Sequence, residues 1–174
     1  MTERTPVEAT NIDGYGSPAF PWSEVRDRLA TPLEGMETIA YLGTVRPDGR
    51  PHVAGVGPCW LDGDYYLACS VASRKIRNLA ENPNATLAIR VPGFDVTLEG
   101  TVSRVDAPDT LERVAETYRA GGWPAEVADG ALTAPYSAQT AGPPPWHVFR
   151  FRFSKVIALR LSESGGAMRW RFDA

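Results

Sequence analysis

The sequence predicts a mainly β domain, a small β-barrel with peripheral helices. Most of the chain consists of short segments rich in β-branched and aromatic residues, separated by tight-turn signals such as Pro47-Asp48-Gly49 and Asp62-Gly63. Only three segments have the apolar spacing of a helix. Many short antiparallel strands with few helices are typical of a barrel or a sandwich.

The overall composition is that of one soluble globular domain. The chain has 174 residues, a net charge of −3 and a pI near 5.4. Proteins that bind nucleic acid normally carry a basic stripe, so this class of partner is not expected. The N-terminus lacks the apolar segment of a signal peptide, and no apolar run is long enough to span a bilayer. These features predict a cytoplasmic protein without a membrane partner.

The N-terminal half is expected to begin with an arm and to continue as a meander. Residues 1–21 are rich in Pro, Gly, Thr and Asn and predict an extended arm, which leaves residues 22–174 as a single domain. Ser23 has the chemistry of an N-cap for a helix that runs to about Leu33. Three strands that pair as consecutive hairpins are expected over residues 38–46, 51–61 and 64–70.

The second half adds two helices and a group of strands. Residues 73–81 predict a helix that ends at Asn82-Pro83, and residues 109–119 predict another. Residues 120–145 contain no clear element, and a loop of that length is either functional or partly disordered. Further strands are expected over residues 85–91, 94–105, 146–153, 156–161 and 167–172.

The start of the helix at residue 73 carries the first functional signal. Arg74 and Lys75 occupy the first helical positions, although the helix dipole favours cations at the opposite end. A phosphate at this point would accept hydrogen bonds from the free backbone N–H groups, from the Ser73 hydroxyl and from both cations. The alternative is a solvated basic helix start on an acidic protein, and spacing alone does not separate the two.

Two glycines inside a strand give the second signal. Gly55 and Gly57 stand at alternate positions, and glycine weakens the interior of a strand. A flat ring laid against the backbone would account for both, whereas a bulge or a barrel corner is the alternative. The glycine strand is expected to pair with residues 64–70, which lead directly into Ser73. Ring and phosphate would then belong to one ligand.

Four longer motifs carry a resemblance to a known family. They read TVRPDGRPHVAGV, YYLACSVASRKIRNLAENP, DVTLEGTVSRV and, at the end of the chain, MRWRF. Together they resemble the pyridoxamine 5′-phosphate oxidase-like superfamily, and most closely its flavin and deazaflavin oxidoreductase branch. The resemblance covers about residues 36–119 and the C-terminal strand. It implies an FMN-binding split β-barrel with Greek-key strands, and a homodimer that holds its cofactor at the subunit interface.

The resemblance also implies which residues hold that cofactor, which would be FMN or the deazaflavin coenzyme F420. Arg74 and Lys75 would bind its phosphate together with Ser73. Trp170 and Arg171 resemble an aromatic–basic pair that the second subunit brings near the ring. The residues expected along the ring or beside it are Ala54, Gly55, Val56, Ala68, Cys69 and Asp95.

Two departures from the family pattern argue against vitamin B6 oxidation. True pyridoxamine 5′-phosphate oxidases carry arginine-rich substrate motifs after the Tyr118 region and near the C-terminus, where this sequence reads ETYRAGGW and MRWRFDA. Ala54 also stands where the oxidases have a phosphate-binding arginine. The implied activity is an F420- or FMN-dependent oxidoreductase that transfers hydride to or from a small organic substrate. The alternative is a carrier of cofactor or haem without turnover, since relatives of this fold bind haem.

The remaining candidate groups favour structural roles. Cys59 and Cys69 lie in apolar runs and are interpreted as buried hydrophobic residues rather than as a disulfide. His52 and His147 have no Cys, Asp or Glu at metal spacing, so no metal site is expected. Contact of His52 with the ring, or with haem iron, is the functional alternative. The aromatic residues expected in the core or in the dimer interface are Trp60, Trp123, Trp146 and Tyr136.

Overall fold

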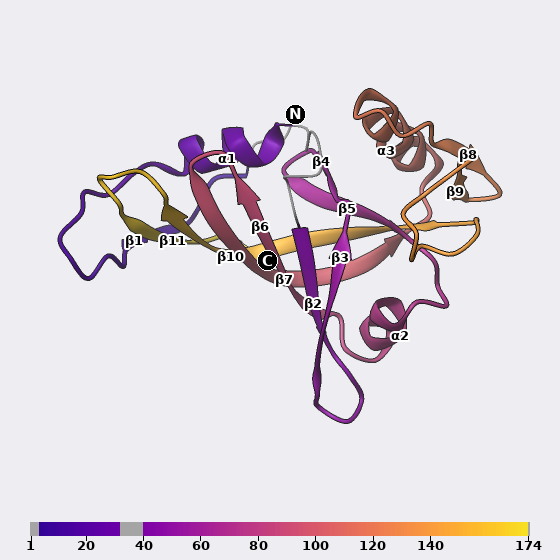
Figure 1. The fold of residues 1–174 in the computed structure, drawn as a ribbon, viewed down its shortest axis with the longest axis horizontal. Helices are drawn as coiled ribbons and strands as arrows, with labels where there is room; N and C mark the ends of the chain where they lie inside the picture. The colour runs from indigo at the N-terminus through magenta and orange to yellow at the C-terminus, as the bar shows by residue number, and fades with distance from the viewer. Residues whose placement is uncertain (1–3, 32–39, 174) are drawn as a thin grey trace.

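One antiparallel sheet dominates the protein, and helices lie around it (Figure 1). The computed structural model describes residues 4–31 and 40–173. A branch leaves the main path of the sheet where β5 (Asp64–Cys69) pairs with β10 and where β4 (Cys59–Leu61) pairs with β5. The prediction of a mainly β protein is confirmed. From edge to edge the main path runs through β1 (Glu8–Asn11), β11 (Ala167–Arg171), β10 (His147–Arg160), β7 (Phe94–Val105), β6 (Asn84–Val91), β2 (Ala40–Val45) and β3 (Pro51–Val56).

The return strand expected over residues 51–61 is interrupted at Gly57-Pro58. Gly55 pairs with Tyr41 of β2, and only the short β4 pairs with β5. The prediction that the glycine strand pairs with residues 64–70 is therefore wrong. Pro58 has no N–H to donate, so a regular ladder cannot continue through it. No ladder among the described residues joins β3 to β4 or β5, so these strands do not close into a barrel, and the split barrel stays a prediction.

β10 is a single strand of 14 residues, where two strands were expected. The expected break is a β-bulge, at which the register with β7 shifts between Phe153 and Lys155. On its other side, the first half of β10 pairs with β5 and the second half pairs with β11. β7 passes so close to the bulge that a Cβ on Gly100 would lie 2.1 Å from the carbonyl oxygen of Arg152. Glycine is required at this crossing for that reason.

Three helices lie within the described residues: α1 (Trp22–Ala30), α2 (Arg74–Glu81) and α3 (Pro108–Ala120). Ser23 is not the N-cap of α1, because the helix begins at Trp22 and Pro21 is its N-cap residue. The helix expected over residues 73–81 begins at Arg74, and Ser73 precedes it as the N-cap residue without a side-chain cap hydrogen bond. Leu33 and residues 38–39, expected to end the first helix and to begin the first strand, lie outside the described residues.

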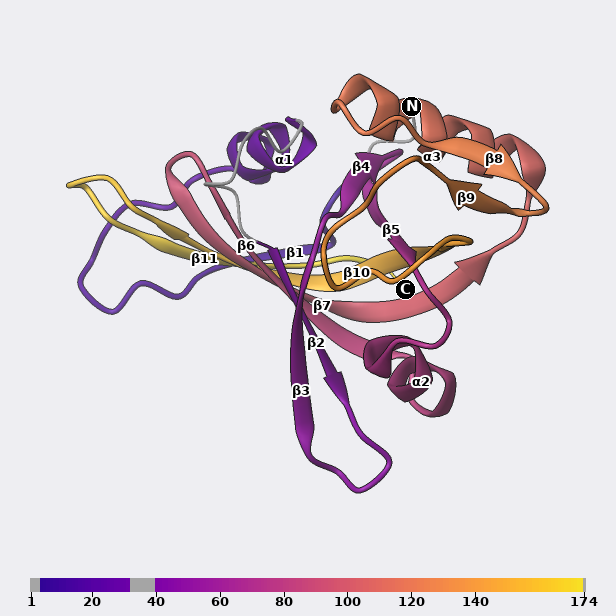
Figure 2. The same cartoon turned by 45° about the vertical axis from the view of Figure 1, so that its right-hand side comes forward.

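Two segments expected to lack regular structure contain strands. β1 lies within the N-terminal arm and pairs with β11. Residues 120–145 contain the hairpin of β8 (Glu126–Ala128) and β9 (Ala131–Thr133), which packs beside α3 (Figure 2). Two backbone hydrogen bonds between Leu132 and Trp146 join β9 to the residue that directly precedes β10.

Two apolar clusters meet at β5 and so position the site. Tyr65 and Leu67 belong to the main core, which fills the space between the sheet and α1. Tyr66 points the other way and packs with Leu111 and Val114 of α3. This alternation follows from the period of two residues in a strand. β5 is therefore covered on both faces, and a cavity opens where the two clusters separate.

Candidate functional site

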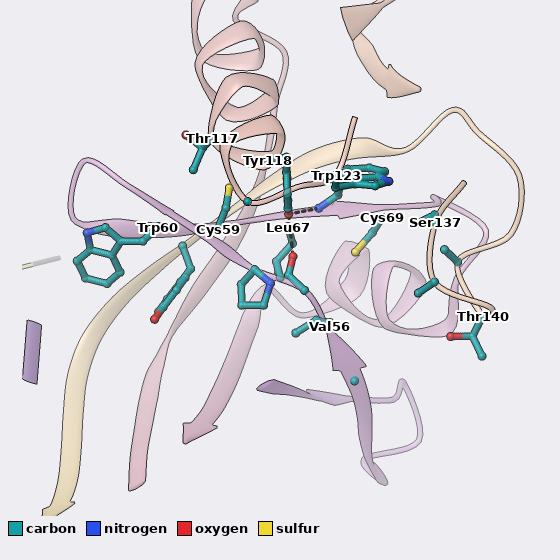
Figure 3. Close-up of a pocket in the computed structure, with 18 of the residues that line it drawn as sticks. Val56, Cys59, Trp60, Leu67, Cys69, Thr117, Tyr118, Trp123, Ser137 and Thr140 are labelled. Carbon is teal, nitrogen blue, oxygen red and sulfur yellow. Dashed lines mark hydrogen bonds between the residues drawn. The ribbon is translucent and has the colours of Figure 1, made fainter. Parts of the chain in front are cut away.

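A cavity of about 570 Å³ lies where β3, β4 and β5 meet the start of α2 and the end of α3 (Figure 3). Val56 and Gly57 border it from the end of β3, and Leu67 and Cys69 border it from β5. Residues 136–141, in the loop after β9, close another side. Ligand pockets commonly have volumes of roughly 300–1,000 Å³. The volume of this cavity lies within that range.

Tyr118, in the last turn of α3, holds the walls of the cavity together. Its hydroxyl donates to the carbonyl of Gly57 at 2.9 Å, and the carbonyl of Tyr66 is a second acceptor at 3.2 Å. The same hydroxyl accepts a hydrogen bond from the Ala68 N–H at 3.2 Å. Burial, as the largest cause, raises the pKa of Tyr118 well above its ordinary value. The neutral hydroxyl therefore joins the bend at Gly57-Pro58 to β5, as the dashed lines in Figure 3 show.

Replacing Tyr118 by phenylalanine is expected to lower the free energy of unfolding by about 0.5–1.5 kcal/mol, because the backbone groups of Gly57 and Ala68 lose a hydrogen-bond partner. Urea unfolding measures the change. Tyr136→Phe is the matched control, since its exposed hydroxyl makes one bond of 3.3 Å to the Gly122 carbonyl. We expect that control to change stability by less than about 0.5 kcal/mol. Equal losses in the two variants would contradict the assigned role of Tyr118.

The loop beside the cavity is fixed by aromatic side chains. Trp123 Nε1 donates to the carbonyl of Tyr136 at 2.6 Å, and the Trp123 ring meets Tyr118 edge-on at 5.0 Å. Trp146 Nε1 donates to the carbonyl of Ala141 at 3.4 Å. Both ends of the segment that lines the cavity are thus tied to the body of the protein, which gives it a defined path.

Cys59 and Cys69 are both free and buried, as expected for small hydrophobic residues. Burial raises the pKa of Cys59 to about 12 and that of Cys69 to about 11. Both groups stay protonated near neutral pH, and a thiol is a poor nucleophile compared with a thiolate. Although both line the cavity, neither is suited to nucleophilic chemistry.

A set of basic side chains gathers beside Ser73, and we refer to Arg46, His52, Arg74 and Lys75 as the basic cluster. Burial lowers the pKa of His52, and the positive charges of Arg46, Arg74 and Lys75 lower it further. The three cations therefore lie near enough to act on one imidazole. Lys75 also lines the cavity.

The cations of the basic cluster form no ion pair with a carboxylate among the described residues, whereas Arg50 nearby is paired with Asp48. The Nε of Arg46 and the hydroxyl of Ser73 are both buried without a hydrogen-bond partner. Such groups are costly unless something binds them. The first turns of α1 and α3 carry an acidic residue but that of α2 carries none, so no side chain in its first turn balances the positive end of the α2 dipole.

Most of the residues predicted to hold a cofactor lie at this cavity. Arg74 lies in the basic cluster next to it. Ala54 faces Leu42 across the β2–β3 ladder and does not line the cavity. Asp95 is paired with Arg90 at 2.6 Å and lies in a separate shallow cleft on the β6–β7 hairpin. The predicted residues that line the cavity are Gly55, Val56, Ala68, Cys69, Ser73 and Lys75.

The C-terminal pair lies away from the cavity. The Trp170 side chain is 1% exposed and packs against Phe20 and Trp22 in the core, with ring centroids 5.7 and 5.6 Å away. Burial of this degree leaves no indole surface for a ligand. Arg171 is exposed and lies 3.4 Å from Glu8 of β1.

Sequence reasoning missed several residues of the site. The sequence places Arg46 only at the end of an expected strand. Arg46 directly precedes the turn between β2 and β3, the hairpin that lies next to α2. Asn78 of α2 donates to the Thr44 hydroxyl at 3.0 Å, which holds the hairpin against α2. His52 pairs with Thr44 across the hairpin and so lies close to the same helix. The hydroxyl contacts of Tyr118 depend on tertiary packing alone.

The sequence predicts neither a metal site nor a membrane-spanning segment. Within residues 4–31 and 40–173, no group of three or more His, Cys, Asp or Glu side chains is arranged to hold a metal ion. None of the helices described here is both long and apolar enough to cross a bilayer.

Solved structures with a similar fold include proteins that bind different cofactors. An F420 reductase matches with 23% identity and a TM-score of 0.51, over 75% of this chain and 94% of that one. A pyridoxamine 5′-phosphate oxidase-related, FMN-binding protein from Nostoc punctiforme matches with 18% identity and a TM-score of 0.54, over 87% and 91%. A heme-binding protein from Mycobacterium smegmatis matches with 18% identity and a TM-score of 0.55, over 80% and 56%. At these identities the likeness is one of fold.

Sequence comparison gives the family. No curated protein matches the chain significantly. The sequence profile of the pyridoxamine 5′-phosphate oxidase family, however, matches residues 24–160. That match includes the strands, the start of α2 and the hairpins that build the cavity. The chain belongs to the pyridoxamine 5′-phosphate oxidase family.

Proposed function

We propose that this protein binds FMN or the deazaflavin coenzyme F420 in the cavity and acts as an oxidoreductase on a small organic substrate. The observation that carries the proposal is the Ser73 hydroxyl, which is buried without a partner beside a basic cluster whose cations form no ion pair among the described residues. FMN and F420 both carry a ribityl phosphate, which supplies the missing anion. The similarity in fold to an F420 reductase and to an FMN-binding protein supports this choice of cofactor.

The residues at the cavity fit such a group. Its phosphate would accept bonds from Ser73, Arg74, Lys75 and the first N–H groups of α2. A Cβ at Gly55 or Gly57 would meet no protein atom within 4 Å, so protein packing does not require glycine at either position. Close approach of a ring to this stretch of backbone accounts for both glycines.

The cofactor, when bound, supplies the hydride chemistry, and the chain supplies binding and position. Burial keeps the hydroxyl of Tyr118 and the thiols of Cys59 and Cys69 protonated near neutral pH. These side chains orient the ring and keep water from it, and we assign no catalytic side chain. Between the two cofactors, the motif resemblance favours F420 slightly.

The proposal includes a second copy of this chain, with the cofactor at the interface of a homodimer. β2 and β3 carry apolar side chains on the face turned away from the core, with Tyr41 45% and Val53 61% exposed. Exposed apolar patches on soluble proteins mark interaction surfaces. A second copy would bury this face, and Asp95 lies on the same surface.

Titration of the purified protein with FMN, F420 and haem, followed by absorbance and fluorescence, tests the proposal. We expect saturable binding of FMN or F420 by a dimer. A Soret band with no flavin binding would favour the alternative of a haem carrier, which the similarity to a heme-binding protein supports. A monomer that binds the cofactor tightly would contradict its placement at a subunit interface.

A further inference from the structure

The β2–β3 hairpin carries Arg46 and His52 of the basic cluster to α2. Asn78 of α2 donates to the Thr44 hydroxyl at 3.0 Å, and hairpin and helix lie side by side (Figure 2). Arg46 lies two residues beyond Thr44, and its N–H continues the ladder by donating to the carbonyl of Arg50 at 2.9 Å. Side chains two residues apart in a strand point to the same side of it. Arg46 therefore points to the side on which Thr44 meets α2.

The other members of the basic cluster lie on the same side of this contact. Arg74 precedes Asn78 by four residues, so both lie on one face of α2. His52 pairs with Thr44, and side chains directly opposite each other in an antiparallel pair share a face of the sheet. The positive charges of Arg46 and Arg74 both add to burial in lowering the pKa of His52, which agrees with this arrangement. Arg46 and His52 thus face the start of α2.

The Arg46 side chain has no acceptor of its own among the described residues. Its Nε is buried without a hydrogen-bond partner, and its guanidinium forms no ion pair there. Hydrogen bonds from Arg50, as the largest cause, and the charge of Arg46 lower the pKa of Asp48, so this carboxylate lies near both cations. The Asp48 side chain nevertheless bonds to Arg50, at 2.6 and 3.0 Å. A buried N–H without an acceptor is unfavourable, and an acceptor from a ligand would remove that cost.

A single phosphate at the start of α2 does not need Arg46. Ser73, Arg74, Lys75 and the first N–H groups of α2 already offer such an anion a full set of donors. A phosphate that is joined to a longer chain as a diester has a single negative charge, shared by its two free oxygens. Arg46 and His52 belong to a different element and add donors beyond that set. The basic cluster therefore extends past the place of one phosphate, toward the hairpin.

We propose that Arg46, with His52 beside it, forms a second anion site that binds another negatively charged group of the same ligand, linked to the phosphate at α2. F420 has such groups, because a glutamyl chain with carboxylates is joined to its phosphate, whereas FMN ends at the phosphate. Arg46 is then the residue that selects F420 over FMN. The choice of F420 rests on the proposed function, but the second anion site itself can be measured with inorganic anions.

Calorimetric titration of the full chain with inorganic phosphate and with pyrophosphate, at one salt concentration, tests for the second anion site. Pyrophosphate is the simplest probe in which a second anionic group is linked to the first. We expect it to bind at least about tenfold more tightly than phosphate, because Arg46 adds a charge-assisted hydrogen bond. Arg46→Gln should bring the two affinities within about threefold of each other and should weaken phosphate binding by less than about threefold.

A second arginine provides the matched control. Arg77→Gln removes the same charge from α2, at an exposed residue whose charge does not act on His52. This variant should keep the preference for pyrophosphate. Arg46→Met retains the apolar stem of the side chain and repeats the test should Arg46→Gln fail to fold.

The same variant separates the two cofactors. Arg46→Gln is expected to weaken the binding of F420 at least about tenfold and that of FMN by less than about threefold. FAD, in which the second anionic group is a phosphate, is the third ligand of this series. Tighter binding of FAD than of F420, lost in Arg46→Gln, would support the second anion site and contradict the choice of F420.

Three results would overturn the second anion site: no preference for pyrophosphate over phosphate, an equal loss of affinity for both anions in Arg46→Gln, or the same effect from Arg77→Gln. An equal loss would mean that Arg46 binds the first phosphate itself. A preference for pyrophosphate without binding of F420, FMN or FAD contradicts only the proposed function. Binding of F420 that Arg46→Gln leaves unchanged contradicts only the second anion site.

Discussion

Replacing Arg74 and Lys75 together by alanine is expected to weaken the binding of FMN or F420 by at least about 100-fold. A hydrogen bond to a charged group contributes about 1.5–3 kcal/mol, and about 1.4 kcal/mol changes a dissociation constant tenfold. The free protein should become slightly more stable, because two cations leave the N-terminus of a helix. Opposite changes in affinity and stability would identify the two residues as ligands of an anion.

A control variant separates this local effect from the change in net charge. Arg28→Ala combined with Arg104→Ala removes the same charge from exposed residues that do not line the cavity. We expect cofactor affinity in this control to stay within about threefold of that of the original chain, because neither side chain lines the cavity and salt screens exposed charges. Fluorescence titration measures both variants at one salt concentration. Equal affinity in the two double variants would remove the support for a phosphate at α2.

Replacing Asp64 by asparagine is expected to lower the free energy of unfolding by about 3 kcal/mol. The Asp64 side chain is 1% exposed, and it accepts bonds from Arg4 at 3.0 Å and from the Nε of Arg150 at 2.7 Å. Removing one partner of a buried ion pair costs about 3–5 kcal/mol, because the remaining charge stays buried. The lower end of that range applies here, since the Arg150 side chain is 37% exposed.

The effect of Asp64 also tests how the N-terminal arm is attached. Arg4 lies over the Phe153 ring at 4.5 Å and donates to the carbonyl of Phe153 at 2.6 Å, so Asp64 helps to hold the arm against β10. Asp48→Asn breaks an exposed pair with Arg50 and is expected to change stability far less, because solvent and salt screen an exposed ion pair. Urea unfolding of both variants measures the difference. A loss for Asp64→Asn no larger than that of Asp48→Asn would refute the buried network.

The elements recovered from the sequence are those whose signals are local. The turn at Asp62-Gly63 has positive φ at both residues, the backbone that a tight hairpin between twisted strands requires. In the strand expected over residues 94–105, Phe94, Val96 and Leu98 alternate with polar residues, and these three side chains are buried. Such patterns are readable because the period of a strand is fixed by its own backbone.

The predictions that failed concern pairing between distant segments. Residues 51–61 were expected to form one strand with two partners, but Pro58 ends the ladder and the chain bends there. The bulge in β10 could not be recognised either, because it depends on the change of partner from β5 to β11. Pairing is decided by what packs on each face, which adjacent residues do not reveal.

The start of α2 was determined by the sequence, because Arg74 and Lys75 oppose the dipole of their own helix and that conflict is local. Only the tertiary structure decided what surrounds them. Arg46 and His52 join the basic cluster through the contact of the β2–β3 hairpin with α2, and Tyr118 closes the cavity from an element about fifty residues away. Local chemistry set the charge of the site, whereas its shape arises from contacts that exist only when the distant elements pack together.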